Sequence, residues 1–146
     1  MRAIREAVTP ADVAAVRELF AEYVRAVDAP CCFVDFEREL AALPEGYESL
    51  LLADGRGCVA LRRIDAATAE LKRLYVRPSH RGTGLGRGLL EAAIAVARER
   101  GYRRVVLDTL PSMAEAHGLY QRFRFREIPP YLAAPTPGAT CFELSL

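Results

Sequence analysis

Residues 81–86 read Arg-Gly-Thr-Gly-Leu-Gly, and this stretch lies where a predicted strand gives way to a predicted helix. Upstream, residues 69–76 alternate between polar and apolar side chains, which is typical of a half-buried strand. Downstream, apolar residues recur at helical spacing from Leu85 to Val96, and Gly101 is expected to end the helix. The glycines therefore occupy the first helical turn, where free backbone amides and the helix dipole favour an anion. The sequence predicts a phosphate-binding loop here.

Two other glycine-rich motifs do not fit this stretch. A P-loop requires Lys-Ser or Lys-Thr after its last glycine, but Arg87 stands five residues beyond Gly82 and no such pair follows. The dinucleotide pattern G-x-G-x-x-G requires a third glycine where this chain has Arg87 or Leu89, depending on the glycine chosen as the first. Asp108, in the next predicted strand, keeps a nucleotide-binding oxidoreductase as a minor alternative.

Length and composition favour one compact domain over residues 1–146, which is long enough to bury well over half of its unfolded surface. Hydrophobic residues make up 51%, and 20 Lys and Arg stand against 19 Asp and Glu, so neither disorder nor a nucleic-acid partner is expected. No apolar run approaches the roughly 20 residues of a membrane span, and no signal peptide is recognisable. We therefore expect a cytoplasmic protein without a membrane partner.

Cysteine and histidine usage gives no sign of a metal site. The chain has four cysteines, which are Cys31, Cys32, Cys58 and Cys141. Their spacing does not repeat, so they are expected to be reduced core residues. His80 and His117 are the only histidines, and no Cys-x-x-Cys pair accompanies them at zinc spacing, so we expect no metal.

The remaining patterns predict a strand, two helices, three strands, a helix, a strand, a helix and two strands. The expected strands cover residues 3–8, 49–53, 58–64, 68–76, 105–110, 125–128 and 140–146. The first helix should begin at Pro10 with Thr9 as its cap, and the others should cover residues 35–42, 85–100 and about 112–123. The alternating basic and aromatic residues 122–126 are read as a helix end entering a strand rather than a nucleic-acid site.

Three segments together resemble the GNAT family of N-acetyltransferases. Residues 81–86 are similar to the family's acyl-CoA-binding loop, residues 119–127 to its Leu-Tyr-x-x-x-Gly-Phe segment, and residues 70–76 to the strand before the loop. The predicted element order is also that of the GNAT fold. We therefore expect an α/β (α+β) fold with a mixed, mostly antiparallel central sheet of about six to seven strands, flanked by about four helices. Two residues depart from the family pattern. Arg124 stands where the family usually has glycine, and Met113 stands where many members have asparagine.

The resemblance implies that acetyl-CoA is the co-substrate and that its acetyl group moves to a primary amine. Backbone groups of Leu74, Tyr75 and Val76 would then pair with the pantetheine arm. The loop would hold the pyrophosphate. The loop residues expected to do so are Arg81, Gly82, Thr83, Gly84, Leu85, Gly86 and Arg87. The two arginines are the expected phosphate ligands, and the alternative for each is a surface arginine.

Amine acetylation needs a base, because an alkylammonium has no lone pair, and an acid for the departing thiolate. The family often carries its base at the position of Glu70, whose alternative is a solvated strand carboxylate. Tyr120 resembles the family's general acid, and its alternative is a core aromatic. His117 lies three residues earlier on the same helical face and is either a second acid or an exposed helical histidine.

The acceptor is expected to be a small-molecule amine, because the chain is compact with short loops. Asp28 and Asp35 could meet a cationic amine, although such residues more often cap helices or face solvent. A protein amino group and a catalytically silent acyl-CoA-binding module remain alternatives. Either a monomer or a homodimer is compatible with the sequence.

Overall fold

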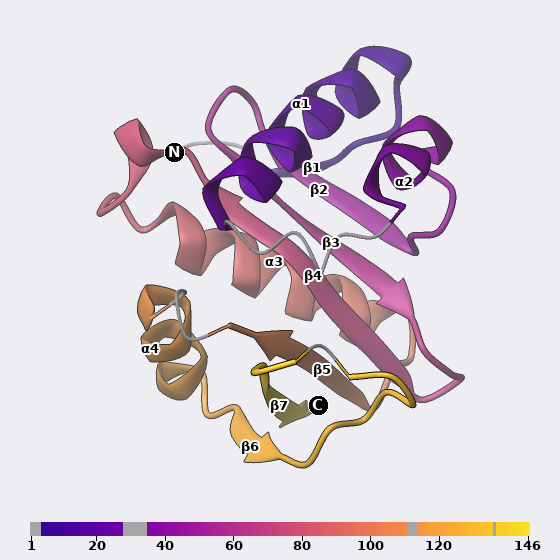
Figure 1. Cartoon of the computed structure of the whole chain (residues 1–146), viewed down its shortest axis with the longest axis vertical. Coiled ribbons are helices and arrows are strands. Elements are labelled where there is room, and N and C mark those ends of the chain that lie inside the picture. Colours follow the sequence, from indigo (N-terminus) through magenta and orange to yellow (C-terminus); the bar gives the residue numbers. More distant parts are fainter. Residues whose placement is uncertain (1–3, 28–34, 111–113, 136) are drawn as a thin grey trace.

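The computed structural model in Figure 1 describes residues 4–27, 35–110, 114–135 and 137–146. The strands within these ranges are β1 (Arg5–Glu6), β2 (Ser49–Ala53), β3 (Gly57–Arg63), β4 (Thr68–Val76), β5 (Arg104–Thr109), β6 (Arg126–Ile128) and β7 (Thr140–Ser145). The α-helices are α1 (Pro10–Val27), α2 (Phe36–Ala42), α3 (Leu85–Glu99) and α4 (Ala114–Arg122). A short 3-10 helix, Pro78–His80, connects β4 to the glycine-rich loop.

All seven strands form one sheet in the order β1-β2-β3-β4-β5-β7-β6. Every neighbouring pair is antiparallel except β4 and β5, which are parallel and joined through α3. The predicted fold class, a mixed and mostly antiparallel sheet with flanking helices, is confirmed. The first strand is shorter than the predicted 3–8, because only Arg5 and Glu6 pair with β2 before the chain turns into α1. The predicted start of the fourth helix at residue 112 lies outside the described residues.

The helices cover both faces of the sheet (Figure 1). Val16, Leu19 and Phe20 of α1 pack on Leu50 and Leu52 of β2, and α2 belongs to the same cluster. The opposite face packs on α3 and α4 through a larger cluster that includes Leu51, Leu61, Leu71, Leu89, Leu90, Val105 and Tyr120. The whole of β2 is buried for this reason, and residues 50–53 are continuously apolar rather than alternating.

A bulge in β4 changes the direction of its side chains next to the loop. Cys58 pairs with Tyr75 but Ala60 pairs with Lys72, so β4 has one residue more than β3 between these pairs. Arg73 lies in this interval with a left-handed φ of 59°, as a residue in a bulge can. Its guanidinium is held by Glu39 of α2 at 2.8 Å, which ties the bulge to the helical layer.

The two parallel strands separate part-way along their length. β4 and β5 pair only from Thr68 and Arg104 to Glu70 and Val106, although both strands continue further. Beyond Glu70, the edge of β4 that faces β5 has no partner strand within the described residues. This separation creates the space in which the candidate site lies.

The exit from α4 uses an arginine where a glycine is the usual choice. The amide of Phe125 donates to the Tyr120 carbonyl and the amide of Arg124 donates to the Gln121 carbonyl, both at 3.0 Å. These two bonds form a Schellman motif, in which the residue after the helix takes a left-handed conformation. Arg124 does so with φ of 67°, and the rings of Tyr120 and Phe125 make the accompanying apolar contact. Arg124 therefore holds a backbone conformation that costs a non-glycine residue free energy.

Replacing Arg124 by glycine should stabilise the protein. The left-handed conformation costs a non-glycine residue at least about 1 kcal/mol, and glycine's extra unfolded-state entropy offsets part of the gain. We expect the free energy of unfolding to rise by about 0.5 to 1 kcal/mol and Tm by about 1 to 4 °C in a thermal melt. The control is Gln121→Gly, at an exposed helical position one turn earlier, which should lower stability by about 1 kcal/mol. A lower Tm for Arg124→Gly would contradict the strain.

No helix in the described ranges is long and apolar enough to cross a bilayer. The same ranges contain no group of three or more His, Cys, Asp or Glu side chains that could hold a metal ion. Cys58 and Cys141 are buried free thiols, as expected, whereas Cys31 and Cys32 lie outside the described residues.

Candidate active site

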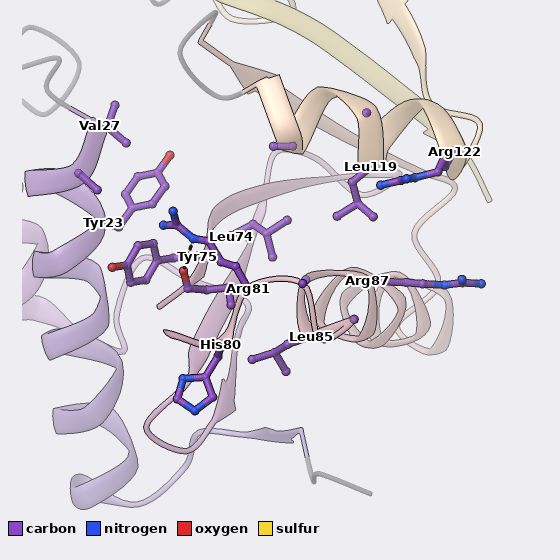
Figure 2. Close-up of a pocket in the computed structure, with 17 residues that line it drawn as sticks. Tyr23, Val27, Leu74, Tyr75, His80, Arg81, Leu85, Arg87, Leu119 and Arg122 are labelled. Atoms are coloured by element: carbon purple, nitrogen blue, oxygen red, sulfur yellow. Dashed lines mark hydrogen bonds between the residues drawn. The ribbon is translucent and has the colours of Figure 1, made fainter. Parts of the chain in front are cut away.

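A cleft of about 840 Å³ opens beside the end of β4, with Tyr23 and Val27 of α1 on one side and Leu119 and Arg122 of α4 on another (Figure 2). Its walls come from the end of α1, the end of β4, the glycine-rich loop with the first turn of α3, and α4. Nine of the ten residues predicted to bind acetyl-CoA line it, and they are Leu74, Tyr75, Val76, Arg81, Gly82, Gly84, Leu85, Gly86 and Arg87. The tenth, Thr83, is not part of the lining. Its hydroxyl instead donates to the His80 carbonyl at 2.6 Å, and this bond within the loop stabilises the loop's conformation.

The glycine-rich loop offers open space above the start of α3. Gly82 and Gly84 have left-handed φ values of 77° and 84°, and an added Cβ at either residue would meet no atom within 4 Å. Gly84 is the N-cap of α3, so the next three backbone amides lack helical partners. Gly86 faces Leu119 of α4, with 3.8 Å between an ideal Cβ and that side chain. The loop therefore presents free amides to a space that glycines leave unfilled, as anion binding requires.

The lining carries positive charge and no acidic side chain among the described residues. The Nε of Arg81 donates to the Val76 carbonyl at 3.0 Å, so only the outer part of its guanidinium faces the cleft. Arg87 pairs with Glu91 at 2.9 Å, and both side chains are exposed. Arg122 lines the cleft from α4, where its side chain lies beside Leu119 (Figure 2). The cleft thus suits an anionic ligand with several phosphate groups.

Sequence reasoning missed Arg122 and Leu119 as cleft residues. Arg122 follows Leu119 by three residues, so both share one face of α4, and this helical spacing could have signalled the pair. Tyr23 reaches the cleft from α1 and packs edge-to-face on Tyr75 with 6.2 Å between ring centres. Nothing in the local sequence places Tyr23 beside β4, because this contact depends on how α1 crosses the sheet.

Tyr120 lies beneath the cleft rather than in its lining. Its side chain is 3% exposed, and its ring packs against Phe125 and Phe142 with centre distances of 5.6 and 6.2 Å. Burial raises the pKa of Tyr120 well above its ordinary value, and the negative charge of Asp108 raises it further. The phenol therefore keeps its proton throughout the neutral range, which is compatible both with a proton donor and with a core aromatic.

Glu70 is completely buried, so its alternative as a solvated strand carboxylate is wrong. Its Oε1 accepts two hydrogen bonds from Arg62, at 2.6 Å from Nη2 and 3.0 Å from Nε. Its Oε2 accepts a hydrogen bond from the Tyr131 hydroxyl and lies 3.9 Å from Nζ of Lys72. Burial of a carboxylate is tolerated here because three donors face it.

The sequence left His117 as either a second acid or an exposed helical histidine, and the structure shows that it is not exposed. It is half-buried, and its ring packs edge-on against Phe142 with 5.5 Å between ring centres. Its Nε2 is buried and has no hydrogen-bond partner among the described residues. Met113 and Asp28 lie outside the described residues, and Asp35 caps α2 only by its left-handed backbone, without a side-chain bond.

Comparison with known proteins decides the family. The family model described as "Acetyltransferase (GNAT) family" matches residues 13–125, which include β2 to β5, the glycine-rich loop and α4. The chain belongs to the GNAT family. An uncharacterized N-acetyltransferase of Schizosaccharomyces pombe is 32% identical to this GNAT chain over 147 residues, covering 94% of this chain and 90% of that protein. Further curated relatives match over 50–56% of this chain and 34–51% of their own length.

Solved GNAT structures share the fold over nearly the whole chain. An acetyltransferase from Streptococcus agalactiae superposes with a TM-score of 0.78 at 22% identity, covering 99% of this chain and 98% of that one. The yncA protein of Salmonella typhimurium, solved with acetyl-CoA, has a TM-score of 0.72 at 26% identity and covers 98% and 92%. At these identities the first comparison bears on the fold alone.

As a GNAT member, the protein is an acetyl-CoA-dependent N-acetyltransferase. The residues present fit this co-substrate, because the glycine loop leaves room for a pyrophosphate and the cleft lining carries three arginines. Family membership also removes the nucleotide-binding oxidoreductase that Asp108 had kept as an alternative.

Proposed function

We propose that this GNAT enzyme moves the acetyl group of acetyl-CoA to a primary amine of a small molecule, by direct attack of the amine on the thioester. One observation carries the proposal. The pairing of β4 with β5 ends after Glu70, and the last residues of β4 lead into the cleft that the glycine-rich loop lines. A carboxylate and an anion-binding loop are thereby joined by one strand, as a reaction between an amine and a CoA thioester requires.

Acetyl-CoA would lie along the free edge of β4. Because β5 pairs no further than Val106, the backbone of residues 74–76 can pair with the amides of a pantetheine arm. An amide of this edge would also polarise the thioester carbonyl, a contribution worth roughly a hundredfold or more in rate. The loop amides would hold the pyrophosphate, with Arg81, Arg87 and Arg122 as phosphate partners.

In this proposal Glu70 is the base and Tyr120 is the acid for the thiolate. Glu70 and Asp108 lie on the same face of the sheet, since Glu70 pairs with Val106 and Asp108 follows two residues later. Two carboxylates on that face favour a cationic amine. Because Glu70 is fully buried, the proposed base lies in a covered space, which suits a slender amine better than a folded protein surface.

A panel of acceptors tests the substrate class. Free CoA released from acetyl-CoA would be measured with alkyl amines, polyamines and amino acids, and with peptides that carry an N-terminal or lysyl amino group. A trialkylamine, which has no transferable hydrogen, serves as the matched control. Turnover with one small-amine class supports the proposal, and turnover with peptides alone would overturn its small-molecule part. Tight acetyl-CoA binding without turnover on any acceptor would favour the silent binding module.

Replacing Arg122 by alanine should weaken acetyl-CoA binding. Loss of one charge-assisted phosphate contact at a solvent-exposed site is worth about tenfold in Kd. Calorimetric titration with acetyl-CoA measures this change. Arg98→Ala, at an exposed position of α3 outside the cleft, removes the same charge and should change Kd less than about twofold. Equal effects of both variants would show a general charge effect and remove Arg122 from the site.

A further inference from the structure

Glu70 has no direct route to an acceptor amine. Its side chain is completely buried, and it is absent from the residues that line the cleft. A proton taken from an amine can therefore reach the carboxylate only through a group that already touches it. The described residues supply three such groups, which are Arg62, Lys72 and Tyr131.

Only one of these three groups can pass a proton on. The guanidinium of Arg62 has five donors and no acceptor, and it does not lose its proton in proteins. The ammonium of Lys72 likewise has donors alone while it is charged, and it lies 3.9 Å from Oε2. The hydroxyl of Tyr131 donates to Oε2 and still has lone pairs that can accept. Tyr131 is therefore the group that connects Glu70 to its surroundings.

Tyr131 is placed between the carboxylate and the outside. It belongs to the connection between β6 and β7, and it is half-buried while Glu70 beneath it is fully buried. Burial raises the pKa of the Tyr131 phenol, and the negative charges of Glu70 and Asp108 act in the same direction. The phenol is thus neutral at rest and keeps a proton that it can donate.

We propose that Tyr131 carries the proton of the acceptor amine to Glu70, a proposal that rests on the base role of Glu70 proposed above. The ammonium nitrogen gives one proton to the Tyr131 oxygen while the Tyr131 hydroxyl proton moves to Oε2 of Glu70. The nitrogen is left with its lone pair, Tyr131 is neutral again and Glu70 is a carboxylic acid. After the acetylated product leaves, the proton returns to water by the same route.

The test compares Tyr131→Phe, Glu70→Gln and the double variant with wild type, using a working amine at saturating acetyl-CoA. A positioned base contributes about 10² to 10⁴ in rate, so each single variant should lower kcat at least a hundredfold while KM for acetyl-CoA stays within about twofold. The double variant should be no slower than Glu70→Gln alone, because both residues act in one step. The phenylalanine ring preserves the packing around Tyr131.

The matched control is Tyr102→Phe. Tyr102 is buried and, like Tyr131, donates to a glutamate, here Glu48 at 2.7 Å, but it lies beyond the end of α3 that is far from the cleft. This variant should lower Tm about as much as Tyr131→Phe and leave kcat unchanged. If Tyr131→Phe lowers kcat no more than Tyr102→Phe does, the relay through Tyr131 is overturned.

The remaining outcomes separate the relay from the proposed function. A wild-type rate for Tyr131→Phe together with an impaired Glu70→Gln overturns the relay and leaves Glu70 as the base. Wild-type rates for both variants overturn the base as well, and an absence of transfer by the wild type overturns the proposed function. A proton inventory of the wild-type single-turnover rate in mixtures of H₂O and D₂O requires no variant to fold. A curved inventory supports two protons in one step, and a linear one contradicts the relay.

Discussion

Replacement of Tyr120 by phenylalanine should lower kcat by about 10² to 10⁴ while the affinity for acetyl-CoA stays nearly unchanged. The variant keeps the ring that packs against Phe125 and Phe142, so the core should change little. It removes the hydroxyl that is proposed to protonate the departing thiolate. Turnover of wild type and variant at saturating acetyl-CoA, with a titration of acetyl-CoA alongside, measures both quantities.

The pH dependence distinguishes an acid from a core aromatic. The pKa of Tyr120 is raised by burial, so the wild type should not lose this proton as pH rises toward 9. A thiol has a pKa of about 8.5, so the thiolate can leave unprotonated more readily at high pH and the defect of the variant should shrink there. A variant that matches wild type at every pH, with only a lower Tm, would assign Tyr120 to the core and leave the acid role to His117 or water.

Replacement of Gly84 by valine should weaken acetyl-CoA binding about a hundredfold or more, because two charge-assisted bonds from the loop amides are each worth about 1.5 to 3 kcal/mol. The valine side chain would occupy the open space over the start of α3. It also has to adopt a φ of 84°, which is a severe outlier for a β-branched residue. Calorimetric titration measures the affinity, and a melt followed by circular dichroism measures the strain.

The strain has a matched control at the other end of the same helix. Gly101 follows α3 with a φ of 83°, and an added Cβ there would also meet no atom within 4 Å. Gly101→Val should therefore lower stability by a similar amount, about 1 to 3 kcal/mol, but leave acetyl-CoA binding unchanged. Gly86→Val adds a variant at helical φ, where binding should fall without left-handed strain. Unchanged affinity for acetyl-CoA in both Gly84→Val and Gly86→Val would contradict the assignment of this loop as the phosphate-binding site.

Much of the fold could be predicted from local signals. The cap at Thr9 is an example, since its Oγ1 accepts the amide of Asp12 at 3.1 Å as the Thr-Pro sequence predicts. The glycine-rich loop could be predicted in the same way. Its left-handed positions are occupied by glycines, and the apolar spacing of α3 begins directly after them, so both signals lie within a few residues. The departure at Arg124 was also visible, because the motif that ends α4 requires the conformation that arginine disfavours.

The surroundings of the proposed base could not be predicted. Glu70 has the same alternation as any strand carboxylate, so its sequence context could not tell a solvated residue from a buried one. Its partner Arg62 depends on the register of β3 against β4. Tyr131 lies 61 residues away, and its hydrogen bond to Glu70 depends on the path of the connection between β6 and β7.

The sequence by itself determined the order of helices and strands, the phosphate-binding loop and the family. These features follow from periodicity, caps and glycines, whose physical causes act between residues close along the chain. Only the tertiary structure decided that β4 and β5 stop pairing after Glu70, that Arg122 lines the cleft and that Tyr131 donates to the Glu70 carboxylate. These features depend on strand register and on which elements pack together, and both are set by the burial of the whole core rather than by any one segment.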